Sequence, residues 1–139
     1  YHTAIRFSGV SAVSFTADHF DTSWVPNGQT IIGTSASDLL QGGVGDDTIQ
    51  GLGGDDTLDG GAGADRFVFS EAIGDEVIID FTQGDDVLYL DNIGGWGSEV
   101  EVFASSNIID GDVVLVSDVG SITLSGLTNP LTESDFILA

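Results

Sequence analysis

Between Gly33 and Val68 the sequence repeats every nine residues, and this period limits the possible folds more than any other feature. The four successive ninths read GTSASDLLQ, GGVGDDTIQ, GLGGDDTLD and GGAGADRFV. A period of nine belongs neither to a helix nor to an ordinary alternating strand. Each ninth has glycine first, aspartate sixth and a large apolar residue eighth (Gly33, Gly42, Gly51, Gly60; Asp38, Asp47, Asp56, Asp65; Leu40, Ile49, Leu58, Phe67).

The chemistry of each ninth predicts a tight turn followed by a short strand. Its first six residues are rich in glycine and aspartate, which favour positive φ and let backbone carbonyls turn inward. Its last three residues can pair with a neighbour and direct one side chain into a core. Two ninths then form one coil, so loop 33–38 lies over 51–56 and loop 42–47 lies over 60–65. Each stacked pair brings two aspartates and several carbonyls around one gap.

A gap lined by oxygen atoms and two carboxylates predicts a site for a hard cation. Ca²⁺ takes about 6–8 oxygen ligands in a flexible geometry, whereas Mg²⁺ demands a stricter octahedron and keeps its waters. Calcium is therefore the expected cofactor, with at least two ions. The chain has no cysteine and only two histidines, His2 and His19, which disfavours zinc and copper sites.

The repeats resemble the RTX (repeats-in-toxin) calcium-binding family, whose nonapeptide is G-G-x-G-x-D-x-U-x, with U a large apolar residue. The second and fourth copies match every fixed place, while Leu52 departs in the third and Thr34 and Ala36 depart in the first. The first copy is therefore expected to be an entry turn with weaker coordination. The alternative, a metal-free Gly/Asp linker, gives no reason for an apolar residue every ninth place. The resemblance implies ligands at the aspartates and in the turns (Asp38, Asp47, Asp56, Asp65; Gly33, Ser35, Gly42, Val44, Gly45, Gly51, Gly53, Gly54, Gly60, Ala62, Gly63).

The composition is strongly acidic. The 139 residues include 23 Asp and Glu against two arginines, Arg6 and Arg66, for a formal net charge of −21. This balance argues against nucleic acid or an anionic membrane surface as a partner, and no apolar run is long enough to insert into a membrane. Because 41% of the residues are hydrophobic, bound cations are expected to neutralise the carboxylates of a folded domain. A cysteine-free secreted, extracellular domain would use metal in place of disulfides.

Two segments precede the repeats. Residues 7–20 resemble residues 124–136, which share Ser-Gly, an aliphatic residue, Thr, Asp and Phe. Residues 1–23 are therefore expected to be the tail of a preceding module, or an opening strand; chance similarity is the alternative. Residues 24–32 carry the turn residues Pro26, Asn27 and Gly28, with Ile31 in the apolar eighth place. They are expected to be a degenerate coil that caps the stack.

After Phe69 the nine-residue phase is lost and further strands are expected. The candidates are separated by Gly, Asn and Asp turns and cover residues 76–81, 87–90, 99–104, 112–116 and 121–124. The predicted fold is all-β: a calcium-binding parallel β-roll over residues 24–69, capped by a C-terminal antiparallel β segment over residues 70–139.

The second half also resembles the C-terminal module of serralysin-type proteases and related type I-secreted exoproteins, through GADRFVF, IIDFTQGDDVLYL, SITLSGL and TESDFILA. In that family the Asp of the I-x-D-F segment lies beside the last calcium turn. The resemblance thus implies roles for Asp80 and for Glu76, which stands where Asp is more usual. It also implies that residues 135–139 form the terminus read by the type I secretion machinery; an ordinary edge strand is the alternative.

No catalytic constellation accompanies these features, because H-E-x-x-H and G-x-S-x-G are both absent. The chain is therefore expected not to be an enzyme. The expected function is a calcium-binding module at the C-terminus of a larger secreted bacterial protein, folding on Ca²⁺ outside the cell. The alternative is a Ca²⁺-stabilised module that binds polysaccharide or a cell surface, in which Trp96 would stack on a sugar; burial of Trp96 is the competing expectation.

Overall fold

The computed structural model describes residues 28–70 and 73–139. The expected module tail at residues 1–23, and Pro26 and Asn27 of the expected capping coil, lie outside these residues.

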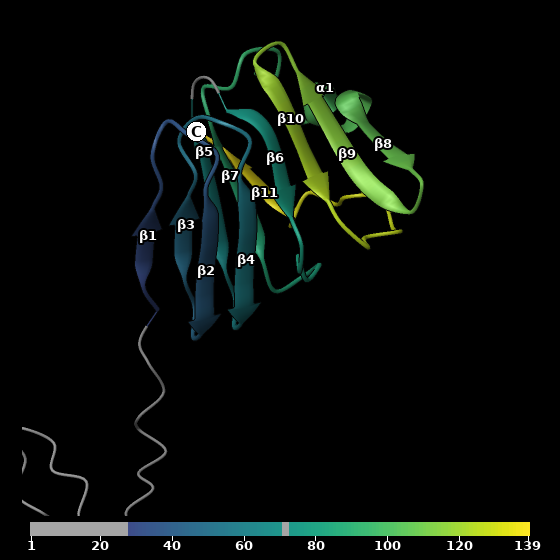
Figure 1. Cartoon of the computed structure of the whole chain (residues 1–139). Helices are drawn as coiled ribbons and strands as arrows, with labels where there is room; N and C mark the ends of the chain where they lie inside the picture. The colour runs from purple at the N-terminus through teal and green to yellow at the C-terminus, as the bar shows by residue number, and fades with distance from the viewer. Residues whose placement is uncertain (1–27, 71–72) are drawn as a thin grey trace, which may run out of the picture.

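Two β-sheets face each other across one core (Figure 1). One sheet has, in spatial order, β1 (Thr30–Ile32), β3 (Thr48–Gln50), β5 (Arg66–Ser70), β7 (Val87–Asp91) and β11 (Phe136–Leu138). The other has, in spatial order, β2 (Leu39–Val44), β4 (Thr57–Ala62), β6 (Gly74–Ile78), β10 (Gly120–Leu124), β9 (Asp112–Ser117) and β8 (Ser106–Ile109).

The strands of the repeats pair in parallel with the predicted offset of 18 residues. Leu40 pairs with Leu58, and Ile49 pairs with Phe67, so apolar eighth places lie beside one another. Ile31 pairs with Ile49 in the same register, which confirms that residues 28–32 belong to a coil that precedes the first full repeat. The predicted parallel β-roll is confirmed.

The roll continues beyond Phe69, so the predicted boundary and the antiparallel assignment of all of residues 70–139 are wrong. Strand β6 pairs in parallel with β4, and β7 with β5. Strands β10 and β11 then add to them in parallel, and only β8, β9 and β10 pair antiparallel.

The nine-residue phase was lost in the sequence because Phe69-Ser70 and Asp80 are inserted between ninths. Residues 71–79 and 81–89 otherwise keep the fourth, sixth and eighth places (Gly74, Gly84; Glu76, Asp86; Ile78, Leu88).

Residues 99–104, predicted as a strand, lie in the helix α1 (Glu99–Ser105). Ser98 and Glu101 form a capping-box sequence: the Ser98 side chain accepts from the Glu101 N–H, and the Glu101 carboxylate accepts from the Gly97 N–H at 2.9 Å. These caps outweigh the alternating pattern, and Val102 turns into the core. Within residues 28–70 and 73–139 the structure contains no helix long and apolar enough to cross a membrane.

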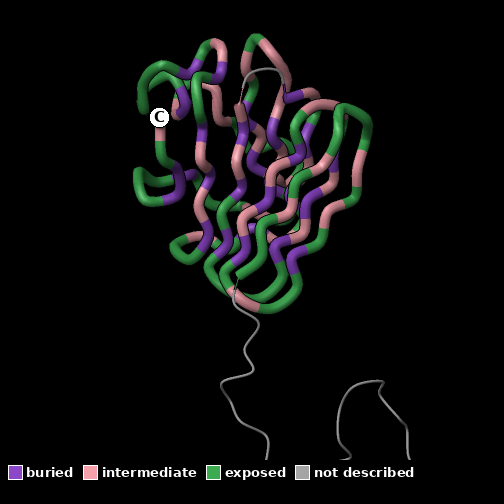
Figure 2. Tube along the Cα trace, turned by 90° about the vertical axis from the view of Figure 1, so that its left-hand side faces the viewer, coloured by how far each residue is buried: buried purple, intermediate pink, exposed green. Residues whose placement is uncertain are grey.

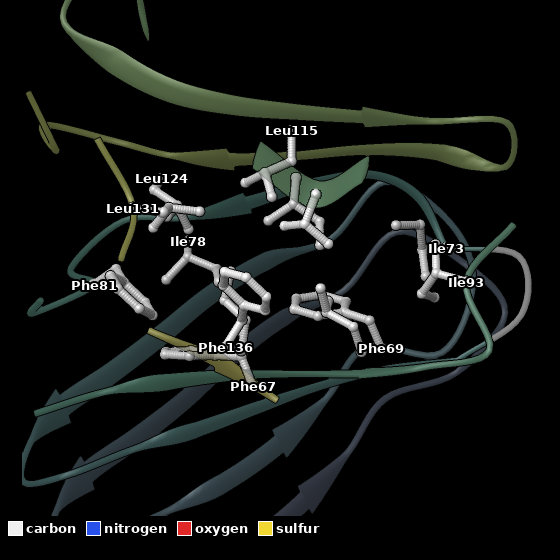
Figure 3. Packing of buried hydrophobic residues seen from close by; sticks show 14 of the residues in the cluster. Phe67, Phe69, Ile73, Ile78, Phe81, Ile93, Leu115, Leu124, Leu131 and Phe136 are labelled. Carbon is white, nitrogen blue, oxygen red and sulfur yellow. The ribbon is translucent and has the colours of Figure 1, made fainter. Parts of the chain in front are cut away.

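The apolar eighth places of successive coils form part of the core. Buried segments alternate with less buried ones along the strands of the roll (Figure 2). Phe67, Ile78 and Leu124 point into the core from both sheets, and Phe81 packs near Phe67 with 6.2 Å between ring centroids (Figure 3). Trp96 is 3% exposed and donates from Nε1 to the Val116 carbonyl at 3.2 Å. The expectation that Trp96 is buried is therefore confirmed, and stacking on a sugar is excluded for this side chain.

The second place of the repeat shows how closely the coils stack. Gly43 and Gly61 occupy equivalent positions in successive coils and both have positive φ, +113° and +91°. A Cβ on Gly61 would collide with the Gly43 carbonyl, whereas a Cβ on Gly43 would meet nothing within 4 Å. The difference arises because Gly43 lies in an outer coil of its sheet and Gly61 lies beneath it.

We predict that Gly61→Ala destabilises the folded protein by at least about 1 kcal/mol more than Gly43→Ala, because both carry the strain of positive φ but only Gly61→Ala adds a clash with backbone. Urea unfolding in saturating Ca²⁺ measures the two free energies of unfolding. Equal losses for the two variants would contradict the close stacking.

Candidate metal centre

The turns of the roll stack acidic side chains into two columns. The strand register places Asp38, Asp56 and Glu76 at equivalent positions, which we call the first column. It places Asp47, Asp65 and Asp86 together in the same way, as the second column. The predicted stacking of 33–38 over 51–56 and of 42–47 over 60–65 is confirmed.

One oxygen of most column aspartates accepts a hydrogen bond from the preceding coil. Asp56 Oδ1 accepts from the Asp38 backbone N–H, Asp65 Oδ1 from that of Asp47, and Asp86 Oδ1 from that of Asp65, each at 2.8 Å. Each bond joins the acidic place of one coil to that of the coil before. The stacked carboxylates are therefore fixed in position by backbone donors.

The remaining oxygens of the inner column residues have no partner. Asp47, Asp56 and Asp65 are each 1% exposed, and their Oδ2 atoms are buried without a hydrogen bond. Glu76 is equally buried, and neither of its carboxylate oxygens has a donor. A buried carboxylate oxygen left unpaired is strongly unfavourable unless a donor or a cation reaches it. These residues therefore fit a cation held between coils.

The first glycine of each ninth makes room for these oxygens. Asp47 Oδ2 and the Gly60 carbonyl oxygen, which belong to successive coils, both crowd the point where a Cβ on Gly42 would lie. Asp56 Oδ2 crowds the same point on Gly51, and Asp65 Oδ2 that on Gly60. A side chain at any of these glycines would fill the space. The structure thus brings a carboxylate oxygen and a backbone carbonyl of the next coil together, as the sequence predicted.

The other predicted turn residues serve mainly to stack the coils. At the fourth place, a Cβ on Gly54 would collide with Ala36 and one on Gly63 with Gly45. At the third place, the Ala62 carbonyl accepts from the Gly45 N–H at 2.7 Å, so it is engaged by the neighbouring coil. Ser35 and Val44 are exposed, and Gly53 donates to the Thr34 carbonyl at 3.2 Å.

Two predicted ligands are arranged differently from the inner aspartates. The Asp38 Oδ2 atom accepts from Thr34, from the backbone N–H at 2.6 Å and from Oγ1 at 2.8 Å. Asp80, one of the inserted residues, accepts from the N–H groups of Gly60 and Gly61 at 2.9 and 2.5 Å. Both carboxylates therefore already have donors within the protein.

The electrostatics show how costly the bare columns are. Burial, and then the neighbouring Asp56 carboxylate, raises the pKa of Glu76 from 4.5 to about 8. Burial also raises the pKa of Asp65, opposed by its hydrogen bond from Asp47 and reinforced by the charge of Asp86. Within residues 28–70 and 73–139 no three acidic or histidine side chains form a group able to hold a metal. A bound cation must therefore combine carboxylates with backbone carbonyls.

A family model described as the RTX calcium-binding nonapeptide repeat matches residues 32–67 in four copies. Residues 32–67 are RTX calcium-binding repeats. The match includes Asp38, Asp47, Asp56 and Asp65 and ends before Glu76 and Asp80.

One solved structure shares the fold of this chain, and a second aligns with it less closely. The extracellular lipase LipA from Serratia marcescens aligns with 79% of this chain at 23% identity and a TM-score of 0.61, so the fold is shared. The alignment covers 21% of the lipase, so the chain spans about a fifth of that protein. The AlgE6R3 subunit of the Azotobacter vinelandii mannuronan C5-epimerase aligns with 82% of the chain and 81% of its own length, at 23% identity and a TM-score of 0.35. None of the curated proteins searched matches the chain.

The sequence analysis missed that the stacked turns of the roll continue beyond the four repeats. A Cβ on Gly74 would collide with Gly54, and one on Gly120 with Gly74, so these glycines extend the fourth-place stack. Both have positive φ, +80° and +144°. The signal was present in the spacing Gly74-x-Glu76-x-Ile78, which keeps the places of the repeat after the two-residue insertion.

We predict that the metal-free protein becomes less stable as the pH rises from about 4.5 to about 8. In this window the folded state keeps a proton on Glu76 that the unfolded chain releases, so raising the pH favours unfolding. The β-sheet circular dichroism of metal-stripped protein at pH 5 and pH 8 measures the effect, and less folded protein is expected at pH 8.

Glu76→Gln should make this pH dependence shallower, while Glu133→Gln, at an exposed position, should leave it unchanged. The same slope in wild type and Glu76→Gln would show that Glu76 does not carry the extra proton.

Proposed function

We propose that this chain is the calcium-binding C-terminal module of a larger secreted bacterial protein, and that it folds when it binds Ca²⁺ outside the cell. The observation that carries the proposal is the set of buried, unpartnered Oδ2 atoms of Asp47, Asp56 and Asp65. When bound, calcium supplies the positive charge and the flexible oxygen coordination that these atoms lack. At least two ions are expected, because both columns contain such atoms.

The coupling to folding follows from where the carboxylates lie. In the unfolded chain they are solvated and far apart, and the roll brings them together in a buried column. The net charge is −21, and Arg66, the one Lys or Arg among the described residues, lies over the Tyr89 ring at 5.4 Å. The protein therefore offers the columns little positive charge of its own. Extracellular calcium modules have dissociation constants of roughly 10⁻⁴–10⁻³ M, which would leave the chain loose where calcium is scarce.

The place of residues 135–139 in the folded sheet supports export of the chain before it folds. Strand β11 pairs in parallel with β7, its Phe136 is 4% exposed, and the Asp135 carboxylate accepts from Thr132 and Gln83. In the folded module the segment 135–139 is thus part of the sheet. If the type I secretion machinery reads this segment, it must do so before β7 and β11 pair. Export of an unfolded chain followed by folding in calcium satisfies that order.

We assign no catalytic role to the chain, in line with the absence of the H-E-x-x-H and G-x-S-x-G motifs. The alternative of polysaccharide binding loses its main support, because Trp96 lies in the core.

We predict that Ca²⁺ titration of the chelated protein restores β-sheet circular dichroism, that Mg²⁺ at the same concentration does not, and that saturating calcium raises the melting temperature. One ion at 100 times its dissociation constant adds roughly 2.7 kcal/mol of stability. The double variant Asp47→Asn, Asp65→Asn should lose most of the calcium response, because it removes two buried ligands of one column.

The matched control is Asp91→Asn, Asp110→Asn, which removes two charges from exposed positions and should keep the full response. A chelated sample with the sheet content and melting temperature of the calcium-loaded one would overturn the proposal.

A further inference from the structure

Not every carboxylate in the stacked turns is open to a cation. The inner residues Asp47, Asp56 and Asp65 have a free Oδ2, whereas three others are closed by a threonine of their own turn. Asp38 Oδ2 accepts from Thr34 N–H and Oγ1, Asp86 Oδ2 from the Thr82 N–H at 2.8 Å, and Asp135 Oδ2 from Thr132 N–H and Oγ1 at 2.6 and 2.8 Å. The closed turns are the outermost ones: Asp38 begins the first column, and Asp86 and Asp135 lie beyond Asp65.

The second residue of the turn separates the two kinds. In the open turns this residue is Gly43, Leu52 or Gly61, and each has positive φ, between +77° and +113°. In the closed turns at Asp38 and Asp86 it is Thr34 or Thr82, and both keep negative φ. Positive φ is particularly unfavourable for a β-branched residue. Threonine at this place therefore selects the other backbone conformation.

The conformation decides which backbone group meets the carboxylate. In a trans peptide the N–H of one residue and the carbonyl of the residue before point in opposite directions. In the first turn the Thr34 N–H points at Asp38, so the Gly33 carbonyl points away from that carboxylate. In the open turns the first carbonyl instead faces the preceding coil, as the Gly51 oxygen does beside Gly33 and the Gly60 oxygen beside Gly42.

At the start of the second column, too, a hydrogen-bond donor of the protein lies where a cation would otherwise be needed. The strand register places Gln29 one coil before Asp47, at the acidic place. The Gln29 side-chain amide donates to the Gly42 carbonyl at 2.9 Å, and its backbone N–H donates to Asp47 Oδ1 at 2.6 Å. A neutral amide thus holds the carbonyl that, in the inner coils, faces an open carboxylate.

We propose that threonine at the second place of the turn replaces the calcium ion, so that Thr34 and Thr82 close the outer turns. Calcium then binds only beside the open carboxylates, which are those of Asp47, Asp56, Asp65 and Glu76. This inference rests on the proposed calcium function and deepens it. Asp38, which the sequence predicted as a ligand, is then a structural residue. In the folded module the outer turns therefore need no ion, and only the inner turns bind one.

The test counts bound ions by native mass spectrometry in saturating Ca²⁺, with circular dichroism to confirm that each variant is folded. Asp56→Asn should lower the count by one. Asp38→Asn should leave the count unchanged, because asparagine still accepts from Thr34. Thr34→Gly should raise the count by one, since glycine can adopt positive φ and has no hydroxyl to donate, and adding Asp38→Asn should remove the extra ion.

Thr128→Gly, at an exposed loop position, is the matched control and should leave the count unchanged. A wild-type protein that binds no calcium, or an Asp56→Asn variant with the wild-type count, would count against the calcium function itself. If Asp56→Asn loses an ion but Asp38→Asn also loses one, or if folded Thr34→Gly gains none, only the threonine rule is overturned.

Discussion

The roll depends on stacking like charges at one place in every coil. Parallel pairing in constant register puts Asp47 over Asp65 and Asp56 over Glu76, and hydrogen bonds between coils fix their positions. The oxygens left over are buried and unpaired. An apolar roll of the same shape would bury no unpaired carboxylate oxygens. Acidic residues scattered over a surface would not bring such oxygens together around one ion. The proposed dependence of folding on a small hard cation follows from these unpaired oxygens.

Glycine makes the stacking possible in two separate ways. At the first place it leaves space for a carboxylate oxygen, and at the fourth place it lets one backbone lie directly on another, from Gly54 to Gly74 to Gly120. The second series runs past the four repeats into β6 and β10, which no longer match the nonapeptide. The coil geometry thus persists where the calcium-binding pattern has ended, because close backbone contact requires glycine whether or not an ion is present.

The far end of the roll is closed by pairing within the chain. Strand β10 is added in parallel to β6 and also forms an antiparallel pair with β9, so the sheet changes direction at this strand. Strand β11 adds to β7 on the opposite sheet. The last coil is therefore assembled from segments far apart in sequence. It can form only when these distant segments have come together.

The sequence alone determined the coil, its register, the apolar core places and the acidic columns. These features all follow from the nine-residue period, which can be read directly from the sequence. It also indicated which metal suits them. The tertiary structure decided what a local pattern could not. The inserted residues hid two further turns, the caps around Ser98 turned an alternating segment into a helix, and Trp96 was buried by β9 rather than exposed. Above all, whether an aspartate carboxylate is open to a cation depends on the φ angle of the residue at the second place of its turn. That angle is seen only in the folded structure.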